Sequence, residues 1–263
     1  MTSVPLLLWI ILFAAFGGIA SAAFAVIFLW VPEERSARIL PHFISFATGA
    51  LLGAALLALL PEAIEGAGPG GAHAIGLALV IGLGVFFVIE KLVLWWHAHA
   101  HDEEGDSAHH DHRVHASGVL VLVGDSIHNA LDGVLIASAF LTSMSLGVVT
   151  TLAVAAHEIP HRVGDFAILV HAGLSRPRAL FLNLATGLAS VIGAIAAYYG
   201  LRGAMGALPY ALAFAAAGFL YIAVAGLIPG LHRRADARTS AIQVILISAG
   251  IAVIAFAEQL THQ

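Results

Sequence analysis

The sequence predicts an all-α protein, a polytopic transmembrane helical bundle of eight spans. Hydrophobic residues make up 60% of the 263 residues and charged residues only 10%, and the mean hydropathy is +0.96. A water-soluble domain of this length needs far more charge on its surface. Apolar stretches of about 20 residues, the length that crosses a bilayer as a helix, recur along the whole chain.

The expected spans, taken in order, are residues 4–30, 39–64, 73–96, 116–142, 145–172, 178–200, 206–230 and 239–260. We interpret the first as a span rather than a cleaved signal peptide, because no Lys or Arg precedes it and its apolar run is too long. Eight spans leave almost no room for a soluble domain. Residues 1–263 are therefore expected to form a single membrane domain.

The basic residues orient these spans. If both termini lie outside, eight basic residues fall in or beside the inner connections and only Arg202 lies at an outer one. The eight are Arg35, Arg38, Arg113, Arg176, Arg178, Arg233, Arg234 and Arg238. Because inner loops of membrane proteins carry an excess of Lys and Arg, we predict an N-out, C-out, multi-pass protein of the plasma (inner) membrane with both termini extracytoplasmic.

Small residues recur inside the spans, where they favour close helix packing. The chain holds 27 glycines, and Gly49 and Gly53 stand four residues apart in span two. Small residues at this spacing let helix backbones approach each other closely in lipid. We therefore expect this face of span two to contact another helix.

One connection, residues 97–115 between spans three and four, is long, polar and rich in histidine. Its histidines are His97, His99, His101, His109, His110, His112 and His115. Such a segment is expected to be a mobile loop, and the predicted orientation places it in the cytoplasm. Imidazole and carboxylate groups suit divalent ions such as Zn²⁺, so the loop predicts auxiliary metal binding; a merely solubilising loop is the alternative.

Two polar clusters lie inside spans four and five, at residues 128–132 (His-Asn-Ala-Leu-Asp) and 157–161 (His-Glu-Ile-Pro-His). An ionisable group at mid-bilayer depth costs roughly 2.5–3.5 kcal/mol on insertion scales, so several together indicate a functional site. Residues four apart share one face of a helix. His128 should therefore project with Asp132, and His157 with His161. The connection at 141–146 is short, so the two spans should be antiparallel neighbours whose pairs meet.

Three imidazoles and one carboxylate around one point suit tetrahedral Zn²⁺. Fe²⁺, Mn²⁺, Co²⁺ or Cd²⁺ would also be accepted, because ligand type alone seldom sets selectivity. Asn129 and Glu158 each follow a ligand by one residue and are candidates for a second metal or for contacts behind the first ligands. For a single histidine, a helix–helix hydrogen bond would be the simpler interpretation. Two matched pairs favour a metal site, with no organic cofactor.

The clusters also carry a family resemblance. Residues 124–133 resemble the fourth-helix motif of the ZIP (Zrt-, Irt-like protein) family of divalent metal transporters, and residues 157–165 resemble the fifth-helix motif HEXPHEXGD of its zinc-importing branch. Residues 87–91 and 218–223 are similar to that branch too. The resemblance implies movement of divalent metal into the cytoplasm by alternating access. It assigns the transported metal to His128, Asp132, His157 and His161, and a neighbouring second metal to the positions of Asn129 and Glu158.

One departure from the family pattern lies inside the fifth-helix motif. Arg162 stands where the branch has Glu, and a cation near a divalent site weakens metal binding unless it is paired. Helical spacing offers Glu158 four residues before it and Asp165 three residues after it. We predict that Arg162 forms an ion pair with one of them and substitutes for a second metal.

Other departures lie in spans two and seven. Ala54 and Ala58 replace Asp and His of similar proteins, and Gly226 and Gly230 replace acidic residues. Polar groups that would assist metal entry or release are therefore missing at these positions.

Two other function classes remain open. The sequence His157-Glu158-Ile159-Pro160-His161 satisfies H-E-x-x-H, the zinc-protease signature, although Pro160 would distort the helix that presents both histidines. A metal sensor without transport is the second alternative. We expect a transporter rather than an enzyme, with a divalent ion and the lipid bilayer as partners, no nucleic acid, and a homodimer left open.

Overall fold

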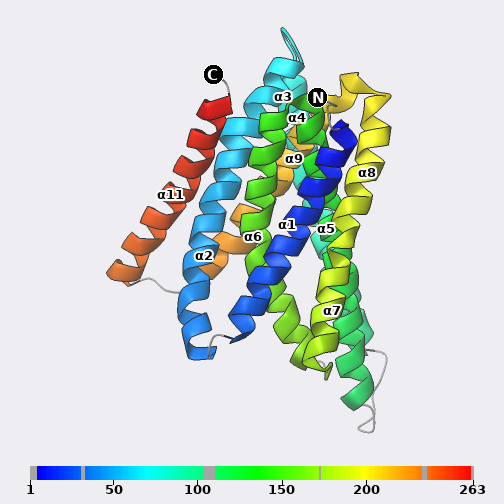
Figure 1. The fold of residues 1–263 in the computed structure, drawn as a ribbon, viewed down its shortest axis with the longest axis vertical. Coiled ribbons are helices and arrows are strands. Elements are labelled where there is room, and N and C mark those ends of the chain that lie inside the picture. Colours follow the sequence, from blue (N-terminus) through cyan, green and yellow to red (C-terminus); the bar gives the residue numbers. More distant parts are fainter. Residues whose placement is uncertain (1–4, 31–32, 103–109, 172, 233–235, 262–263) are drawn as a thin grey trace.

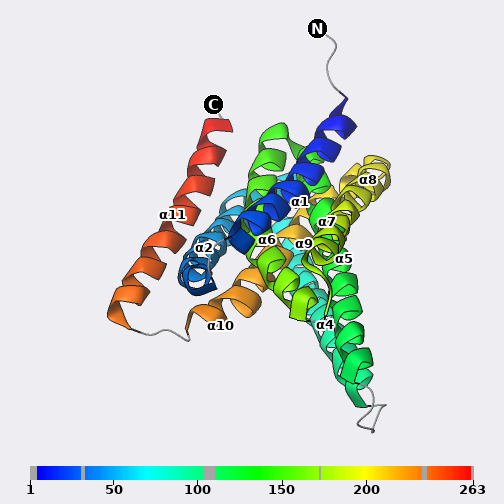
Figure 2. The same cartoon turned by 60° about the horizontal axis from the view of Figure 1, so that its bottom comes forward.

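The computed structural model describes residues 5–30, 33–102, 110–171, 173–232 and 236–261. Within these residues the chain is helical, without strands, which confirms the all-α prediction. The helices run up and down in one bundle (Figures 1 and 2). Their bounds are α1 Leu6–Trp30, α2 Glu33–Gly53, α3 Leu60–Gly66, α4 Ala72–Asp102, α5 His110–Thr142, α6 Met144–His171, α7 Arg176–Thr186, α8 Leu188–Arg202, α9 Leu208–Tyr221, α10 Ile228–Leu231 and α11 Ala237–Thr261.

A helical rod occupies each of the eight predicted stretches, but three rods are interrupted. The π-helical segment η1, Ala54–Leu59, joins α2 to α3, and a second one, η3, Ile222–Leu227, joins α9 to α10. A short 3-10 turn, η2, Met205–Ala207, precedes α9. The third interrupted rod consists of α7 and α8, which are separated by a turn at Gly187. The π-helical segments include Ala54, Ala58 and Gly226, three of the positions that depart from the family pattern.

Five rods of the described chain are long and apolar enough to cross a membrane: Arg38–Gly66, Ala72–Leu92, Arg176–Arg202, Met205–Leu231 and Ala237–Gln259. A sixth, Leu6–Gly18, is apolar but shorter. Helices α5 and α6 are not among these rods. They carry the ionisable residues of the two clusters, and these residues lower their mean hydropathy. The protein is a multi-pass membrane protein, whereas the count of eight spans remains a prediction.

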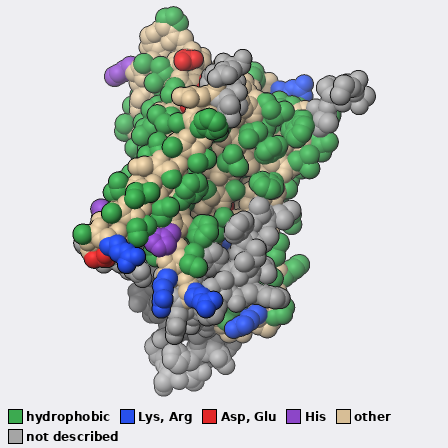
Figure 3. All heavy atoms as spheres, turned by 60° about the vertical axis from the view of Figure 1, so that its left-hand side comes forward, with side chains coloured by type: hydrophobic (Ala, Val, Ile, Leu, Met, Phe, Trp, Pro, Cys, Tyr) green, Lys and Arg blue, Asp and Glu red, His purple; other side chains and the backbone are tan. Residues whose placement is uncertain are grey.

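Helix α1 begins and α11 ends at the same end of the bundle, and α5 begins at the opposite end (Figure 1). On the face shown in Figure 3, hydrophobic side chains cover the middle of the molecule, and most Lys and Arg side chains gather toward the lower end, where α2, α7 and α11 begin. Large apolar side chains such as Val80, Ile192 and Ile245 are more than 60% exposed. A bilayer would cover this surface.

The histidine-rich connection is shorter than the predicted loop of residues 97–115. Helix α4 continues to Asp102 and α5 begins at His110, so His97, His99, His101, His110, His112 and His115 are in helix. Alternation with Ala98 and Ala100 explains part of this result, because alanine is the strongest helix former. His109 and the side chains of all seven histidines lie outside the described residues.

Glycine contacts fix the helices around the site. A Cβ atom at Gly133 of α5 would lie 1.8 Å from the Ser190 carbonyl oxygen of α8, and one at Gly193 would lie 2.0 Å from the Ala130 carbonyl oxygen. These two backbones touch because neither residue has a side chain. Gly49 of α2 meets Ile247 of α11 in the same way, which confirms the helix contact expected for that face of span two.

Candidate metal centre

The polar clusters meet because α5 and α6 form a tight helical hairpin. Helix α5 ends at Thr142 and α6 begins at Met144, with Ser143 between them. The Ser143 hydroxyl accepts a hydrogen bond from the Leu146 backbone N–H at 3.1 Å and so caps the new helix. Because the helices are antiparallel, the turn that holds His128 and Asp132 lies beside the turn that holds His157 and His161.

Four side chains converge on one point. One ligand atom from each of His128, Asp132, His157 and Glu158 lies within 4.8 Å of the other three. The two histidine Nε2 atoms are 3.3 Å apart, and Asp132 Oδ2 lies 3.7 Å from His128 Nε2 and 3.5 Å from His157 Nε2. Metal–ligand bonds of 2.0–2.1 Å imply tetrahedron edges of about 3.3–3.4 Å. The spacing is therefore close to that of a zinc site.

Glu158 belongs to this group and not to an adjoining position. Its Oε1 atom lies 3.5 Å from His128 Nε2 and 3.9 Å from His157 Nε2. The third imidazole, that of His161, lies beside the group, with its ring centroid 5.3 Å from that of His128 and 5.9 Å from that of His157. Three of the four predicted ligands, His128, Asp132 and His157, therefore converge together with Glu158, whereas His161 lies beside this group.

Three buried polar atoms at this point have no hydrogen-bond partner among the described residues: Asp132 Oδ2, Glu158 Oε1 and His161 Nε2. A buried polar atom without a partner costs about 1–3 kcal/mol, and more when it is charged. Each of the three atoms can donate a lone pair to a cation. No hydrogen-bond donor of the described residues reaches either carboxylate oxygen. A divalent cation bound between them would satisfy the whole set at once.

Arg162 is buried behind the centre, with none of its surface exposed. Its Nε donates to Glu158 Oε2 at 2.9 Å, as predicted from the four-residue spacing, and its Nη1 lies 3.3 Å from Asp125 Oδ2. The same Nη1 donates to Thr186 Oγ1 at 2.6 Å, and also to the backbone oxygen of Asn183 at the end of α7. Oxygen atoms from three helices therefore surround the guanidinium.

Asn129 completes the surroundings of Arg162. Its Oδ1 accepts a hydrogen bond from Arg162 Nη2 at 2.7 Å, while its Nδ2 donates to Asp125 Oδ1 at 2.8 Å. The side chain is 1% exposed. Both ends of its amide are engaged, so Asn129 lies behind the four converging side chains instead of among them.

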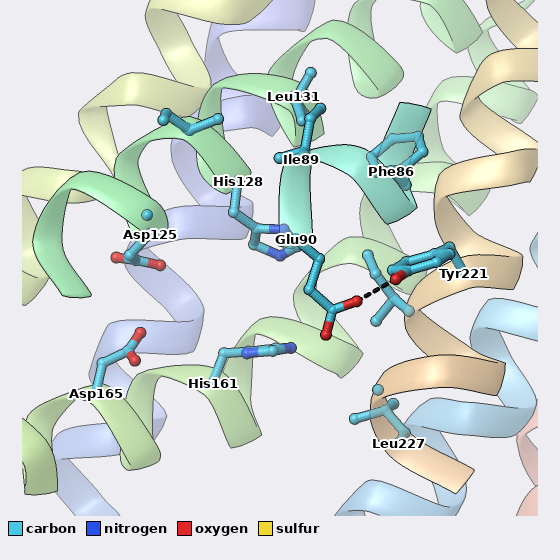
Figure 4. A pocket seen from close by; sticks show the side chains of 14 residues that line it. Phe86, Ile89, Glu90, Asp125, His128, Leu131, His161, Asp165, Tyr221 and Leu227 are labelled. Carbon is cyan, nitrogen blue, oxygen red and sulfur yellow. Dashed lines mark hydrogen bonds between the residues drawn. The ribbon is translucent and has the colours of Figure 1, made fainter. Parts of the chain in front are cut away.

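A cavity of about 350 Å³ opens beside His128 and His161. Figure 4 shows His128, His161 and Glu90 facing it, with Asp125 and Asp165 to one side. Tyr221 of α9 donates a hydrogen bond to Glu90 of α4 across the cavity. Given the directions of α4, α5 and α6, the residues Glu90, Asp125 and Asp165 lie on the side of the α4–α5 connection.

On the other side of the centre the described side chains pack closely and are mostly apolar. The next turns of α5 and α6 place Leu135, Ile136, Ala153 and Val154 in the main core, each at most 2% exposed. Ala54 and Ala58 of η1 are buried in the same core. Among the described residues, the cavity beside the centre lies on the side of Asp125 and Asp165, and closely packed side chains lie on the other side.

Sequence reasoning did not single out several residues of this region. Asp125 lies one helical turn before Asn129 inside the quoted motif, so helix periodicity could have found it. Glu90 also stood in a quoted stretch, at residues 87–91. Tyr221 likewise stood in the quoted stretch 218–223. For Asn183 and Thr186 the chain offered no local signal, because they come from another helix, α7.

A model of the family described as ZIP Zinc transporter matches residues 96–258. The chain is 38% identical to zinc transporter ZIP13 of Pongo abelii over 84% of this chain and 68% of that protein. It is 31% identical to zinc transporter SLC39A7 of Rattus norvegicus over 94% of this chain and 71% of that protein. Zinc transporter zipt-7.1 of Caenorhabditis briggsae is 30% identical over 87% of this chain and 71% of its own length. With its converging histidines and carboxylates inside a membrane-type helical bundle, the chain belongs to the ZIP zinc transporter family.

Proposed function

We propose that this protein moves a divalent metal ion, with Zn²⁺ as the main substrate, into the cytoplasm by alternating access. The proposal rests on three buried atoms, on Asp132, Glu158 and His161, that have no hydrogen-bond partner in the described part of the chain. They lie next to the Nε2 atoms of His128 and His157, which are 3.3 Å apart. The tetrahedral spacing favours Zn²⁺. Fe²⁺, Mn²⁺, Co²⁺ and Cd²⁺ are competitors with similar ligand preferences.

The proposed orientation of the protein in the membrane rests on the distribution of charge and of open space. The cavity extends from the centre toward the end of the bundle where the predicted inner arginines lie, including Arg176 and Arg178 at the start of α7. Toward the opposite end, the described side chains next to the centre pack closely and are mostly apolar. With the positive-inside orientation, both termini are extracytoplasmic and the conformation is open to the cytoplasm. We propose the plasma membrane as the membrane that holds the protein. The histidine-rich segment 97–115 would then receive the released ion.

The contacts of Glu158 do not support the interpretation of the protein as a zinc protease. A general base must hold a free carboxylate oxygen near an attacking water. Glu158 Oε2 instead accepts a hydrogen bond from Arg162 Nε, and Glu158 Oε1 lies near two imidazoles. A measurement of metal flux across the membrane distinguishes a transporter from a metal sensor, because a sensor binds the ion without carrying it across.

The test is uptake by sealed proteoliposomes that contain the purified protein and a zinc-sensitive dye. Wild type should give Zn²⁺ uptake, and His157→Ala should reduce it to the rate of empty liposomes. His73→Ala is the matched control, because His73 is an exposed histidine at the start of α4, far from the centre. Binding of Zn²⁺ without flux in wild type would favour the sensor and overturn the proposal.

A further inference from the structure

We infer that the guanidinium of Arg162 is a built-in cation that fills the place of a second metal and limits this centre to one divalent ion. The inference rests on the proposed function and concerns how many ions the centre holds. Its basis is the contact geometry on both sides of Glu158.

Glu158 has the geometry of a bridging carboxylate. Oε1 points to the group formed by His128, His157 and Asp132, whereas Oε2 accepts a hydrogen bond from Arg162 Nε at 2.9 Å. In two-metal sites the ions lie about 3.5–4 Å apart and share such a carboxylate. Here one side of the bridge is free for an ion, and the other side is occupied by the arginine.

The surroundings of Arg162 consist of oxygen atoms. Asp125 Oδ2, Asn129 Oδ1, Glu158 Oε2, Asn183 Oδ1 and Thr186 Oγ1 all lie 2.6–3.3 Å from a guanidinium nitrogen. Carboxylate, amide and hydroxyl oxygens are also the ligands that bind divalent cations. A metal ion cannot enter this shell while the guanidinium fills it.

Charge leads to the same conclusion. Asp125, Asp132 and Glu158 are each at most 8% exposed, and a buried charge is costly unless it is compensated. Counted as ionised, these three carboxylates are neutralised by one guanidinium and one divalent ion together. A second divalent ion would leave two uncompensated positive charges in a buried site.

Arg162 is therefore a positioning residue. Arginine remains protonated throughout the accessible pH range, so this cation, unlike a metal, cannot be released, exchanged or removed by a chelator. It also holds Glu158 in the rotamer that directs Oε1 toward the transported ion.

The test counts ions at the buried centre. Protein in lipid nanodiscs is loaded with Zn²⁺, and the ions that wild type binds in excess of the matched His157→Ala protein are counted by elemental analysis. This difference cancels binding by the histidine-rich segment. We expect one ion for wild type and for Arg162→Lys, which keeps the charge, and two ions for Arg162→Glu.

X-ray absorption at the zinc edge gives a second readout that a purely structural role of Arg162 would not change. Arg162→Glu should add a metal–metal distance of about 3.5–4 Å, which wild type and Arg162→Lys should lack. Two ions in wild type, or one ion in a folded Arg162→Glu protein, would overturn the inference. If Arg162→Glu does not fold, the wild-type count alone still decides. Absence of zinc flux in wild type would instead contradict the proposed function. The failure of the inference and the failure of the proposed function therefore give different results.

Discussion

Arg162 and Glu158 form a fully buried ion pair one helical turn apart on α6, with Arg162 Nε 2.9 Å from Glu158 Oε2. The pair lies directly behind the two histidines whose Nε2 atoms are 3.3 Å apart. The second oxygen of Glu158, Oε1, has no hydrogen-bond partner among the described residues. Glu158 therefore lies between a permanent cation, the Arg162 guanidinium, and a position that an exchangeable metal ion can occupy.

Breaking this pair should destabilise the protein. Arg162→Ala leaves the buried carboxylates of Asp125 and Glu158 uncompensated, and removal of one partner from a buried ion pair costs about 3–5 kcal/mol. Thermal or denaturant unfolding in detergent should show the loss. Arg178→Ala, an exposed arginine at the start of α7, should change stability by less than about 0.5 kcal/mol. Equal effects of the two substitutions would contradict the role of the pair.

Asp132 should contribute directly to metal affinity. Asp132→Asn keeps the shape of the side chain but removes its charge, so the dissociation constant for Zn²⁺ should rise about 10–100-fold, a loss of about 1.4–2.7 kcal/mol. A competition titration with a chromophoric chelator measures this change. Asp236→Asn, at an exposed position before α11, serves as the control and should leave the constant unchanged.

Zinc binding should weaken as the pH falls. A histidine binds metal only as neutral imidazole, whose ordinary pKa is about 6.5, and protons therefore compete with the ion below about pH 6. Titrations from pH 7.5 to pH 5 should show a rising dissociation constant for wild type. The low-affinity component that remains in His157→Ala provides the baseline. A constant affinity over this range would exclude imidazole ligands.

The contact between α5 and α8 should tolerate no side chain. A Cβ atom at Gly193 would lie 2.0 Å from the Ala130 carbonyl oxygen, two residues from His128. Gly193→Val should therefore push α5 from its place and abolish both folding yield and zinc uptake. Gly84→Val is the matched control on α4, because a Cβ atom there meets nothing within 4 Å. Normal uptake by Gly193→Val would show that the α5–α8 contact does not position the site.

Local patterns predicted the helical stretches, the approach of α5 and α6, and the pairing of Arg162 with Glu158, because these depend on hydropathy and on i, i+4 spacing. The binding of metal by His128, Asp132, His157 and His161 remains a prediction that the geometry supports. Local patterns did not predict the contacts of Arg162 with Asn183 and Thr186, because helix α7 approaches α6 only through tertiary packing. The π-helical segments at Ala54–Leu59 and Ile222–Leu227 also lacked a signal. Both segments consist of apolar residues and glycine, so a local change in helical period leaves no mark on the hydropathy pattern.

The most direct measurement is the position of zinc itself, from anomalous scattering at the zinc edge in crystals of the protein grown with Zn²⁺. We predict one strong peak within about 2.0–2.2 Å of His128 Nε2, His157 Nε2 and Asp132 Oδ2, with Glu158 Oε1 or His161 Nε2 beside it. Zinc found only along residues 97–115, with no peak between α5 and α6, would contradict the account.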